Sequence, residues 1–534
     1  MFNQIVLNRS NPNQPTNLPT NLLIVPAEQN RPTRASLATA PNHNYYHRLH
    51  MPDSAPTHAH PQSQAIPASL LTPIWAALTL TFLCSASGVI TSGIYYITKQ
   101  TYGFTSTANY ALALLQGVTY IVGALAAGPI LRYVLRRWNV SPRSILFALM
   151  LIMAGLAAIP WLAIHMLATA PSAISGTPSG TPLDIIASSP PAWPIWLLIT
   201  LYSPLTGALW PMVEAYVSGG KSGRRLRSTI GWWNVTWSSA LVGMSLSIAP
   251  LIEAHGSLAI LLAGGLHLIS IFVLFAFARQ PAPHVTHATH VTHFALNSPI
   301  SHEQSAHERT IAADLALALR TRAQSLLVTF RLLLPTSYVV STALVPFLPS
   351  QMARIGIEPA HFTIVGSVWL FGRVIGFLTL QQWQGWHNRW WPTILSPILL
   401  LVGLALSVFA HVPLIGQDIT DSASAHVQTA AGSLLVAGLF CHGLAMSTIY
   451  TGAIYYAMDT SEAQVDSGGT HEALIGVGYT IGPLCGLLAA SIAHLTTRDS
   501  LFEPTLMSLV GAIALIMAGI TARRVARIAH STPT

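Results

Sequence analysis

The chain has 534 residues, of which 51% are hydrophobic and only 8% are charged. Because a soluble domain carries roughly 25% charged residues, this composition excludes a soluble globular enzyme. The net charge of +8 does not indicate a nucleic-acid partner, since the basic residues lie in short segments between apolar runs, where they set membrane topology.

The first 67 residues are rich in Asn, Pro, Thr and His and contain no apolar stretch long enough for a signal-peptide core. We expect them to form a disordered tail. The scarcity of acids there also fits an organelle transit peptide, although no amphipathic Arg-bearing helix accompanies it. The three cysteines all fall inside later apolar runs, so no disulfide framework is expected.

After the tail, apolar runs of about 20 residues recur, and each is long enough to cross the ~30 Å hydrocarbon layer as a helix. Open strands would leave backbone groups unpaired in lipid, and a β-barrel would show short alternating segments. The predicted fold class is therefore an all-α membrane protein with twelve transmembrane helices. They are expected at residues 70–97, 108–131, 145–168, 193–217, 230–252, 258–278, 326–348, 362–382, 392–410, 430–458, 473–495 and 504–522.

The positions of the 25 Lys and Arg residues indicate the orientation in the membrane. With the N-terminus inside, twenty of them lie in cytoplasmic segments and three in exterior loops, as the positive-inside rule requires. Both termini are therefore predicted to be cytoplasmic. The predicted domains are the tail (1–67), a six-helix bundle (68–279), a His-rich cytoplasmic linker (280–325) and a second six-helix bundle (326–528).

The fourth and tenth spans share a pattern at a constant offset of 245 residues. Ser203, Gly207, Ala208, Trp210 and Glu214 correspond in this way to Thr448, Gly452, Ala453, Tyr455 and Asp459. We interpret the two bundles as parallel repeats of one six-helix unit, which is a transporter architecture.

Twelve spans in two parallel halves, with cytoplasmic ends and a long cytoplasmic link, resemble the major facilitator superfamily over residues 68–528. Between its second and third spans, that family carries a Gly, an Asp-Arg pair and a closing Gly-Arg-Arg or Gly-Arg-Lys. Gly128, Arg136 and Arg137 match this signature, whereas Arg132 replaces the acid and Leu135 the second Gly. The family's interior charge network therefore does not carry over intact.

A second pattern of the family is a Gly-Pro pair in the fifth span, which marks exporters that exchange drugs for protons. The fifth span lacks this pair. Trp237 and Ser238 occupy the place that Gly482 and Pro483 fill in the eleventh span. The resemblance therefore disfavours drug/proton exchange.

The resemblance also implies that the first, fourth, seventh and tenth spans line a central cavity. Polar and aromatic residues recur on these spans at helical spacing, and neighbouring spans add to them. The candidate substrate-binding residues are Ser92, Tyr95, Trp210, Asn234, Tyr338, Arg373, Thr448 and Tyr455. The alternative is that hydroxyl groups and glycines on these helices serve close helix packing.

Arg373 lies about halfway along the eighth span, where an unpaired guanidinium is expensive and usually faces the protein interior. If it faces the cavity, it favours a substrate with an anionic or strongly accepting group. A hydrogen bond to backbone carbonyls of a neighbouring helix is the alternative. His267 and His442, also inside spans, are interpreted as hydrogen-bonded structural residues in preference to proton carriers.

Glu214 and Asp459 lie at the inner ends of the fourth and tenth spans, at equivalent positions of the repeat. We expect both to act as cytoplasmic gate latches that form ion pairs when the transporter is closed inside, with Arg136, Arg137 and Arg224 among the gating residues. Ordinary solvation of helix ends and proton carriage by Glu214 are the alternatives.

The linker contains four histidines at three-residue spacing, which could ligate zinc, copper or nickel: His284, His287, His290 and His293. The repeated Val-Thr-His unit also fits drifted low-complexity sequence, and no Cys or carboxylate completes a defined geometry. No metal ligand is assigned. No phosphate-binding glycine loop, nucleophile elbow or catalytic carboxylate pair is found, so no cofactor or enzyme activity is expected.

These features predict a secondary active transporter that moves a small organic solute by alternating access, with proton symport as an option. The alternative is a transporter-like receptor that binds a solute without translocating it. The expected partners are an anionic or aromatic small molecule and the lipid bilayer. The protein is expected to be a monomeric, multi-pass protein of the cell inner (plasma) membrane.

Overall fold

A computed structural model describes residues 72–168, 190–221, 223–282, 304–414, 422–460 and 465–531. The predicted tail, the exterior loop after the third span and the four evenly spaced linker histidines lie outside the described residues. The described residues up to 282 are called the first half below, and those from 304 onward the second half.

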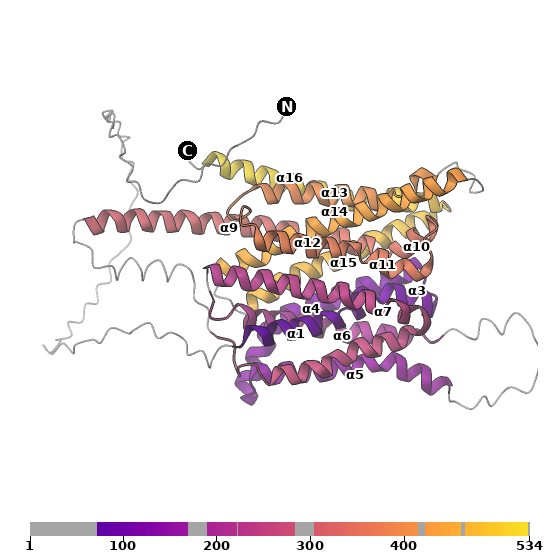
Figure 1. Cartoon of the computed structure of the whole chain (residues 1–534), viewed down its shortest axis with the longest axis horizontal. Helices are drawn as coiled ribbons and strands as arrows, with labels where there is room; N and C mark the ends of the chain where they lie inside the picture. Colours follow the sequence, from indigo (N-terminus) through magenta and orange to yellow (C-terminus); the bar gives the residue numbers. More distant parts are fainter. Residues whose placement is uncertain are drawn as a thin grey trace, which may run out of the picture. The chain divides into compact units, whose positions relative to one another are not determined.

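The described residues form helices joined by short connections, with no strand among them. The helices are α1 (Ile74–Ser87), α2 (Val89–Ser92), α3 (Ile94–Tyr102), α4 (Ser106–Trp138), α5 (Pro142–Ala168), α6 (Trp193–Ser218), α7 (Gly223–Leu274), α9 (Gln304–Leu344), α10 (Leu348–Arg354), η3 (Pro359–His361), α11 (Phe362–Gly366), α12 (Val368–Gln382), α13 (Trp391–Val408), η4 (Val412–Leu414), α14 (Ser422–Thr460), α15 (Val465–Leu495), η5 (Asp499–Leu501) and α16 (Phe502–Ser531). The long helices run alongside one another (Figure 1).

The predicted number of membrane spans is confirmed, because twelve segments of the described chain are long and apolar enough to cross a membrane. The first span, Ile74–Ser92, combines α1 and α2, and the eighth, Pro359–Gln382, combines η3, α11 and α12. α7 supplies two spans, which are separated at His255, where the backbone is non-helical (φ −147°, ψ 64°). The all-α membrane fold predicted from the apolar runs therefore holds.

Several helices extend beyond their predicted boundaries, and α15 and α9 are two examples. α15 begins at Val465, where the sequence indicated 473, and α9 begins at Gln304, inside the predicted linker. The first turns of α15 are polar, so hydropathy missed them, yet His471 and Glu472 in these turns are buried. Buried polar residues of a membrane helix face other helices and not lipid. The first turns of α15 can therefore be polar. The start of α9 extends beyond the neighbouring helices (Figure 1).

The first span is interrupted at Gly88, and a second break follows its last residue, at Gly93. Gly88 separates α1 from α2, and Gly93 separates α2 from α3. Between these breaks the hydroxyls of Thr91 and Ser92 donate to the carbonyl oxygen of Gly88, at 2.8 and 3.1 Å. The break at Gly88 is slight, because the dihedral angles of this residue (φ −61°, ψ −11°) stay in the right-handed helical region.

α4 lies between the two halves. It packs along α6 of the first half and along α15 of the second half. A Cβ atom at Gly123 would lie 1.9 Å from the carbonyl oxygen of Pro204 in α6, and one at Gly117 would lie 2.4 Å from the backbone of Tyr479 in α15. Glycine is therefore what lets α4 approach the backbones of both neighbours, as is common between membrane helices.

Candidate functional site

A cavity of about 150 Å³ lies between the two halves. Both halves contribute to its wall, through α1 to α7 on one side and α9, α12, α14 and α15 on the other. Aromatic rings make up much of the lining: Tyr95, Tyr120, Tyr202, Trp210, Trp233, Trp237, Tyr338, Trp369, Tyr450 and Tyr479. A wall of this kind suits a flat, partly apolar solute.

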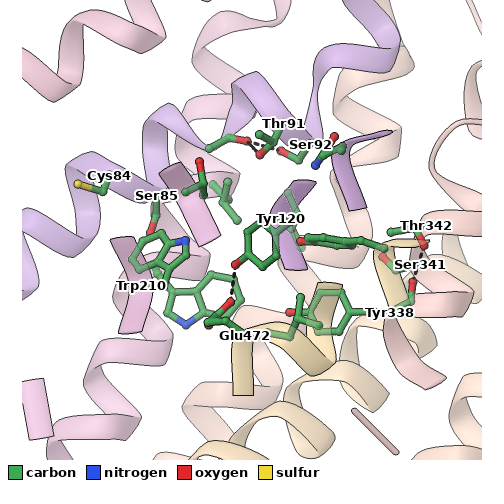
Figure 2. A pocket seen from close by; sticks show the side chains of 18 of the residues that line it. Cys84, Ser85, Thr91, Ser92, Tyr120, Trp210, Tyr338, Ser341, Thr342 and Glu472 are labelled. Atoms are coloured by element: carbon green, nitrogen blue, oxygen red, sulfur yellow. Dashed lines mark hydrogen bonds between the residues drawn. The ribbon is translucent and has the colours of Figure 1, made fainter. Parts of the chain in front are cut away.

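Hydrogen bonds hold several of these rings in place. The hydroxyl of Tyr95 donates to Oε1 of Gln116 (3.0 Å), and Nε1 of Trp233 donates to Oγ1 of Thr81 (3.0 Å). Small hydroxyl side chains complete the lining, among them Ser85, Thr91, Ser92, Ser341 and Thr342 (Figure 2). The hydroxyls of Thr91, Ser92 and Thr342 donate to backbone carbonyl oxygens, so their oxygen lone pairs remain to accept a hydrogen bond from a solute.

Arg373 supplies the only cationic side chain in this lining. It is 2% exposed, and its guanidinium carbon lies 4.2 Å from the centre of the Trp237 ring and 4.6 Å from that of Trp369. Among the described residues, no carboxylate lies within 4.0 Å of it and its Nε atom has no hydrogen-bond partner. A cation–π contact is worth about 2 kcal/mol when desolvated, whereas burying a charge costs several kcal/mol. The two rings offset only part of that cost.

Glu472 is the carboxylate of the cavity wall. It is 3% exposed and accepts a hydrogen bond from the hydroxyl of Tyr120, which points toward it (Figure 2). Glu214 of α6 (2% exposed) and His471 of α15 (0% exposed) complete a cluster in which one ligand atom from each residue lies within 4.8 Å of the others. Two carboxylate charges at 4.8 Å repel by about 3 kcal/mol at an effective dielectric of roughly 20, so the pair does not carry both charges unless a bound cation compensates them; a proton on one carboxylate removes the repulsion instead.

Contacts near both ends of α4 join it to helices of the second half. Near the end that leads to α5, Arg132 forms an ion pair with Asp466 of α15. Near the start of α4, the hydroxyl of Tyr110 donates to the carbonyl oxygen of Ala343 in α9 (2.7 Å). The central cavity lies between these two contacts.

A second cavity, of about 210 Å³, lies between α7, α12 and α14 and the connection after α12. Its lining includes Arg224, Arg227, Asn234, His387 and Tyr455. Burial lowers the pKa of His387 to about 4, and the charge of Arg227 acts in the same direction. The cavity therefore carries permanent positive charge from its two arginines and a neutral imidazole at pH 7.

Five of the eight predicted substrate-binding residues line the central cavity: Ser92, Tyr95, Trp210, Tyr338 and Arg373. Asn234 and Tyr455 line the second cavity instead. Thr448 lines neither cavity, and its hydroxyl donates to the carbonyl oxygen of Leu444 one turn earlier in α14 (3.1 Å).

The role of the candidate gating residues stays a prediction, and the structure gives their surroundings. Glu214 forms no ion pair with a described arginine, because its carboxylate points into the cluster with Glu472 and His471 and not toward the helix end. Arg136 and Arg137 are exposed at the end of α4, Arg224 lines the second cavity, and Asp459 is half-buried near the end of α14. The ion pair that joins the halves is Arg132–Asp466, which the sequence analysis did not identify.

His267 accepts or donates a hydrogen bond with the hydroxyl of Tyr202 (2.7 Å), as expected of a structural histidine. His442 is equally buried, but neither of its ring nitrogens has a hydrogen-bond partner among the described residues. The expectation of a hydrogen-bonded structural histidine therefore holds for the first and is wrong for the second.

No family model and no curated protein matches the chain. Solved structures similar to it include the nucleoside transporter NupG and a point mutant of that protein, each with a TM-score of 0.48. They share 12% and 13% sequence identity with the chain, cover 84% of it, and are themselves covered over 98% and 99% of their length. Likeness at this level identifies neither a family nor a substrate.

Proposed function

We propose that the protein is a secondary active transporter of the major facilitator type, which carries a small organic solute across a membrane by alternating access. The observation that supports this most strongly is the central cavity, because both halves build its wall and it lies at the level where the first span is interrupted. Transporters built from two helix bundles hold their substrate at such an interface.

The substrate that fits this wall is a flat or aromatic molecule that carries an anionic group. The aromatic rings offer faces for stacking, and Arg373 offers an unneutralised cation beside Trp237 and Trp369. An anion bound there would form charge-assisted hydrogen bonds with the guanidinium. These bonds would offset the part of the cost of burying the Arg373 charge that the two rings do not offset. Tyr338, which neighbours Arg373 on the cavity wall, is placed to assist.

Alternating access would proceed through the two contacts at the ends of α4. Opening toward one face breaks the Arg132–Asp466 ion pair, and opening toward the other breaks the contact between Tyr110 and Ala343. Each contact is small: an ion pair with both side chains about half exposed contributes ~1 kcal/mol or less. Either one can therefore be broken at low cost while the other persists.

The test is flux into proteoliposomes that contain the purified protein. A panel of radiolabelled aromatic carboxylates, with their amides as uncharged controls, is offered with and without an imposed pH gradient. We expect saturable uptake of at least one acid, little uptake of its amide, and loss of uptake in Arg373→Gln. Saturable binding without flux would identify a receptor instead, and a response to the pH gradient would identify proton symport.

A further inference from the structure

We propose that Glu214, His471 and Glu472 bind a divalent transition-metal ion, of which zinc is the representative, between the two halves. The site shares Glu472 with the wall of the central cavity, but ion binding can be measured whether or not any solute is transported, so the two proposals can fail separately. The three residues are far apart in the sequence, so no spacing motif indicates a metal site. Packing of α6 against α15 brings them together.

The ligand atoms of the three side chains converge in one place. One atom from each of the three side chains lies within 4.8 Å of the other two, and all three side chains are at least 97% buried. Both ring nitrogens of His471 have no hydrogen-bond partner among the described residues, and the oxygens of Glu214 have none apart from a bond that a proton would make with Glu472. Buried polar atoms are normally satisfied, so the unpartnered imidazole beside two carboxylates points to a bound ligand.

The negative charge of the two buried carboxylates also favours a bound cation. The cluster holds two carboxylates, and no Lys or Arg of the described chain lies within 4.0 Å of either one. A divalent cation would neutralise both charges, and neutral imidazole is a common third ligand beside carboxylates. A proton shared between the carboxylates would neutralise one charge only and would leave both nitrogens of His471 without a partner.

The residues around the three ligands would orient them and leave room for an ion. The hydroxyl of Tyr120 donates to Oε2 of Glu472 and would orient that carboxylate, as outer-sphere hydrogen bonds do at metal sites. Glu472 also lines the central cavity, which gives an ion or a water molecule a route to the cluster. A Cβ atom at Gly468 would lie 2.5 Å from Oε2 of Glu214, so the glycine leaves the room that this carboxylate needs.

One imidazole and two carboxylates form a mixed nitrogen and oxygen set of three ligands. Zinc accepts such a set and takes water or another group in the fourth position, whereas magnesium and calcium favour oxygen ligands alone. Because Glu214 belongs to α6 and the other two ligands belong to α15, the ion would join the halves. It would stabilise the arrangement in which these two helices are in contact.

The experiment measures zinc in the full-length protein, purified without a His tag and washed with a weak chelator to clear the exposed histidines. Zinc content is determined for the wild type, Glu214→Gln, His471→Gln and the matched control His442→Gln. His442 is a buried histidine with unpartnered nitrogens but no carboxylate beside it among the described residues. X-ray absorption at the zinc edge of the wild-type protein reports the ligands without any substitution.

We expect a single zinc ion per chain in the wild type and in His442→Gln, and none in Glu214→Gln or His471→Gln. The absorption spectrum should show one imidazole among oxygen ligands, and zinc should raise the melting temperature of the wild type but magnesium should not. Zinc-free wild-type protein whose melting temperature zinc leaves unchanged would overturn the proposal. Retention of the ion in His471→Gln, or a spectrum with several imidazoles, would also overturn it.

Discussion

Arg373 is the residue on which substrate recognition should depend most strongly, because its charge is buried and no described carboxylate neutralises it. Replacement by Gln removes the charge, and replacement by Lys keeps the charge but loses the planar group that lies over two indole rings. A charge-assisted hydrogen bond is worth about 1.5–3 kcal/mol, so the half-saturation concentration in Arg373→Gln should rise roughly tenfold or more.

Arg373→Lys should raise the half-saturation concentration less than Arg373→Gln does. Uptake kinetics in proteoliposomes give both values, and the melting temperature of each variant serves as the control for folding. If affinity is unchanged in a well-folded Gln variant, Arg373 has no part in binding the solute. A lowered melting temperature with normal affinity would assign it a structural role.

His387 gives a prediction about stability and pH. Its ring donates through Nδ1 to the carbonyl oxygen of Gln384 (3.0 Å), and burial lowers its pKa from the ordinary 6.5 to about 4. Between these values the unfolded chain binds more protons than the folded protein, so stability is present above pH 6.5 and is lost as the pH falls toward 4.

His387→Gln should therefore lose less melting temperature than the wild type when the pH is lowered from 7 to 5 in detergent solution. His494→Gln, at an exposed position, is the matched control and should follow the wild type. Parallel pH profiles for His387→Gln and the wild type would show that the His387 ring does not titrate in this window.

At the residue scale, the sequence identified the buried cation and several cavity residues but not the carboxylate cluster. Arg373, Trp210 and Tyr338 could be found because a charge or a polar aromatic ring inside an apolar run is costly unless it faces the interior. Glu472 and His471 could not, because they lie in a polar segment that resembles a loop, and only tertiary packing buries it. Hydrophobic periodicity and residue spacing do not predict that tertiary contacts bury a polar segment.

At the scale of helices, the contact between α4 and α6 depends on Gly123. A methyl group there would meet the carbonyl oxygen of Pro204 at 1.9 Å, and backbone cannot move aside as a side chain can. Gly123→Ala should therefore separate the two helices and cost about 1–3 kcal/mol, as other overpacked sites do. Thermal unfolding in detergent should show a clearly lower melting temperature.

The matched control is Gly155→Ala in α5, where a Cβ atom would have no neighbour within 4 Å. That substitution should leave the melting temperature equal or slightly raised, because Ala favours the helix over Gly. Equal melting temperatures for the two variants would contradict the close packing of α4 against α6.

The number of spans could be read from the sequence, but some details of individual helices could not. Long apolar runs fix the number of spans, since lipid admits few alternatives. The interruption of the first span at Gly88 and the early start of α15 depend on which neighbours each helix meets. The offset of 245 residues between the fourth and tenth spans remains a prediction of repeat structure.

At the scale of the whole molecule, the orientation in the membrane rests on the distribution of basic residues and can be tested at two exposed sites. Ser144, at the start of α5, is predicted to face the cytoplasm, and Thr496, after α15, to face the exterior. In cysteine-free protein in intact cells, an impermeant maleimide should modify Thr496→Cys and not Ser144→Cys. Breaking the cells should make Ser144→Cys accessible to the reagent. Modification of Ser144→Cys in intact cells would contradict the predicted orientation.

The central claim is that the cavity between the halves opens to each face of the membrane in turn. Thr206 lines this cavity about halfway along α6, so a cysteine there is suited to report access from both sides. In protein without Cys84, Cys441 and Cys485, Thr206→Cys is treated with an impermeant thiol reagent in sealed vesicles of right-side-out and inside-out orientation. The account predicts modification in both orientations, each slowed by a transported solute, whereas modification in one orientation only would contradict it.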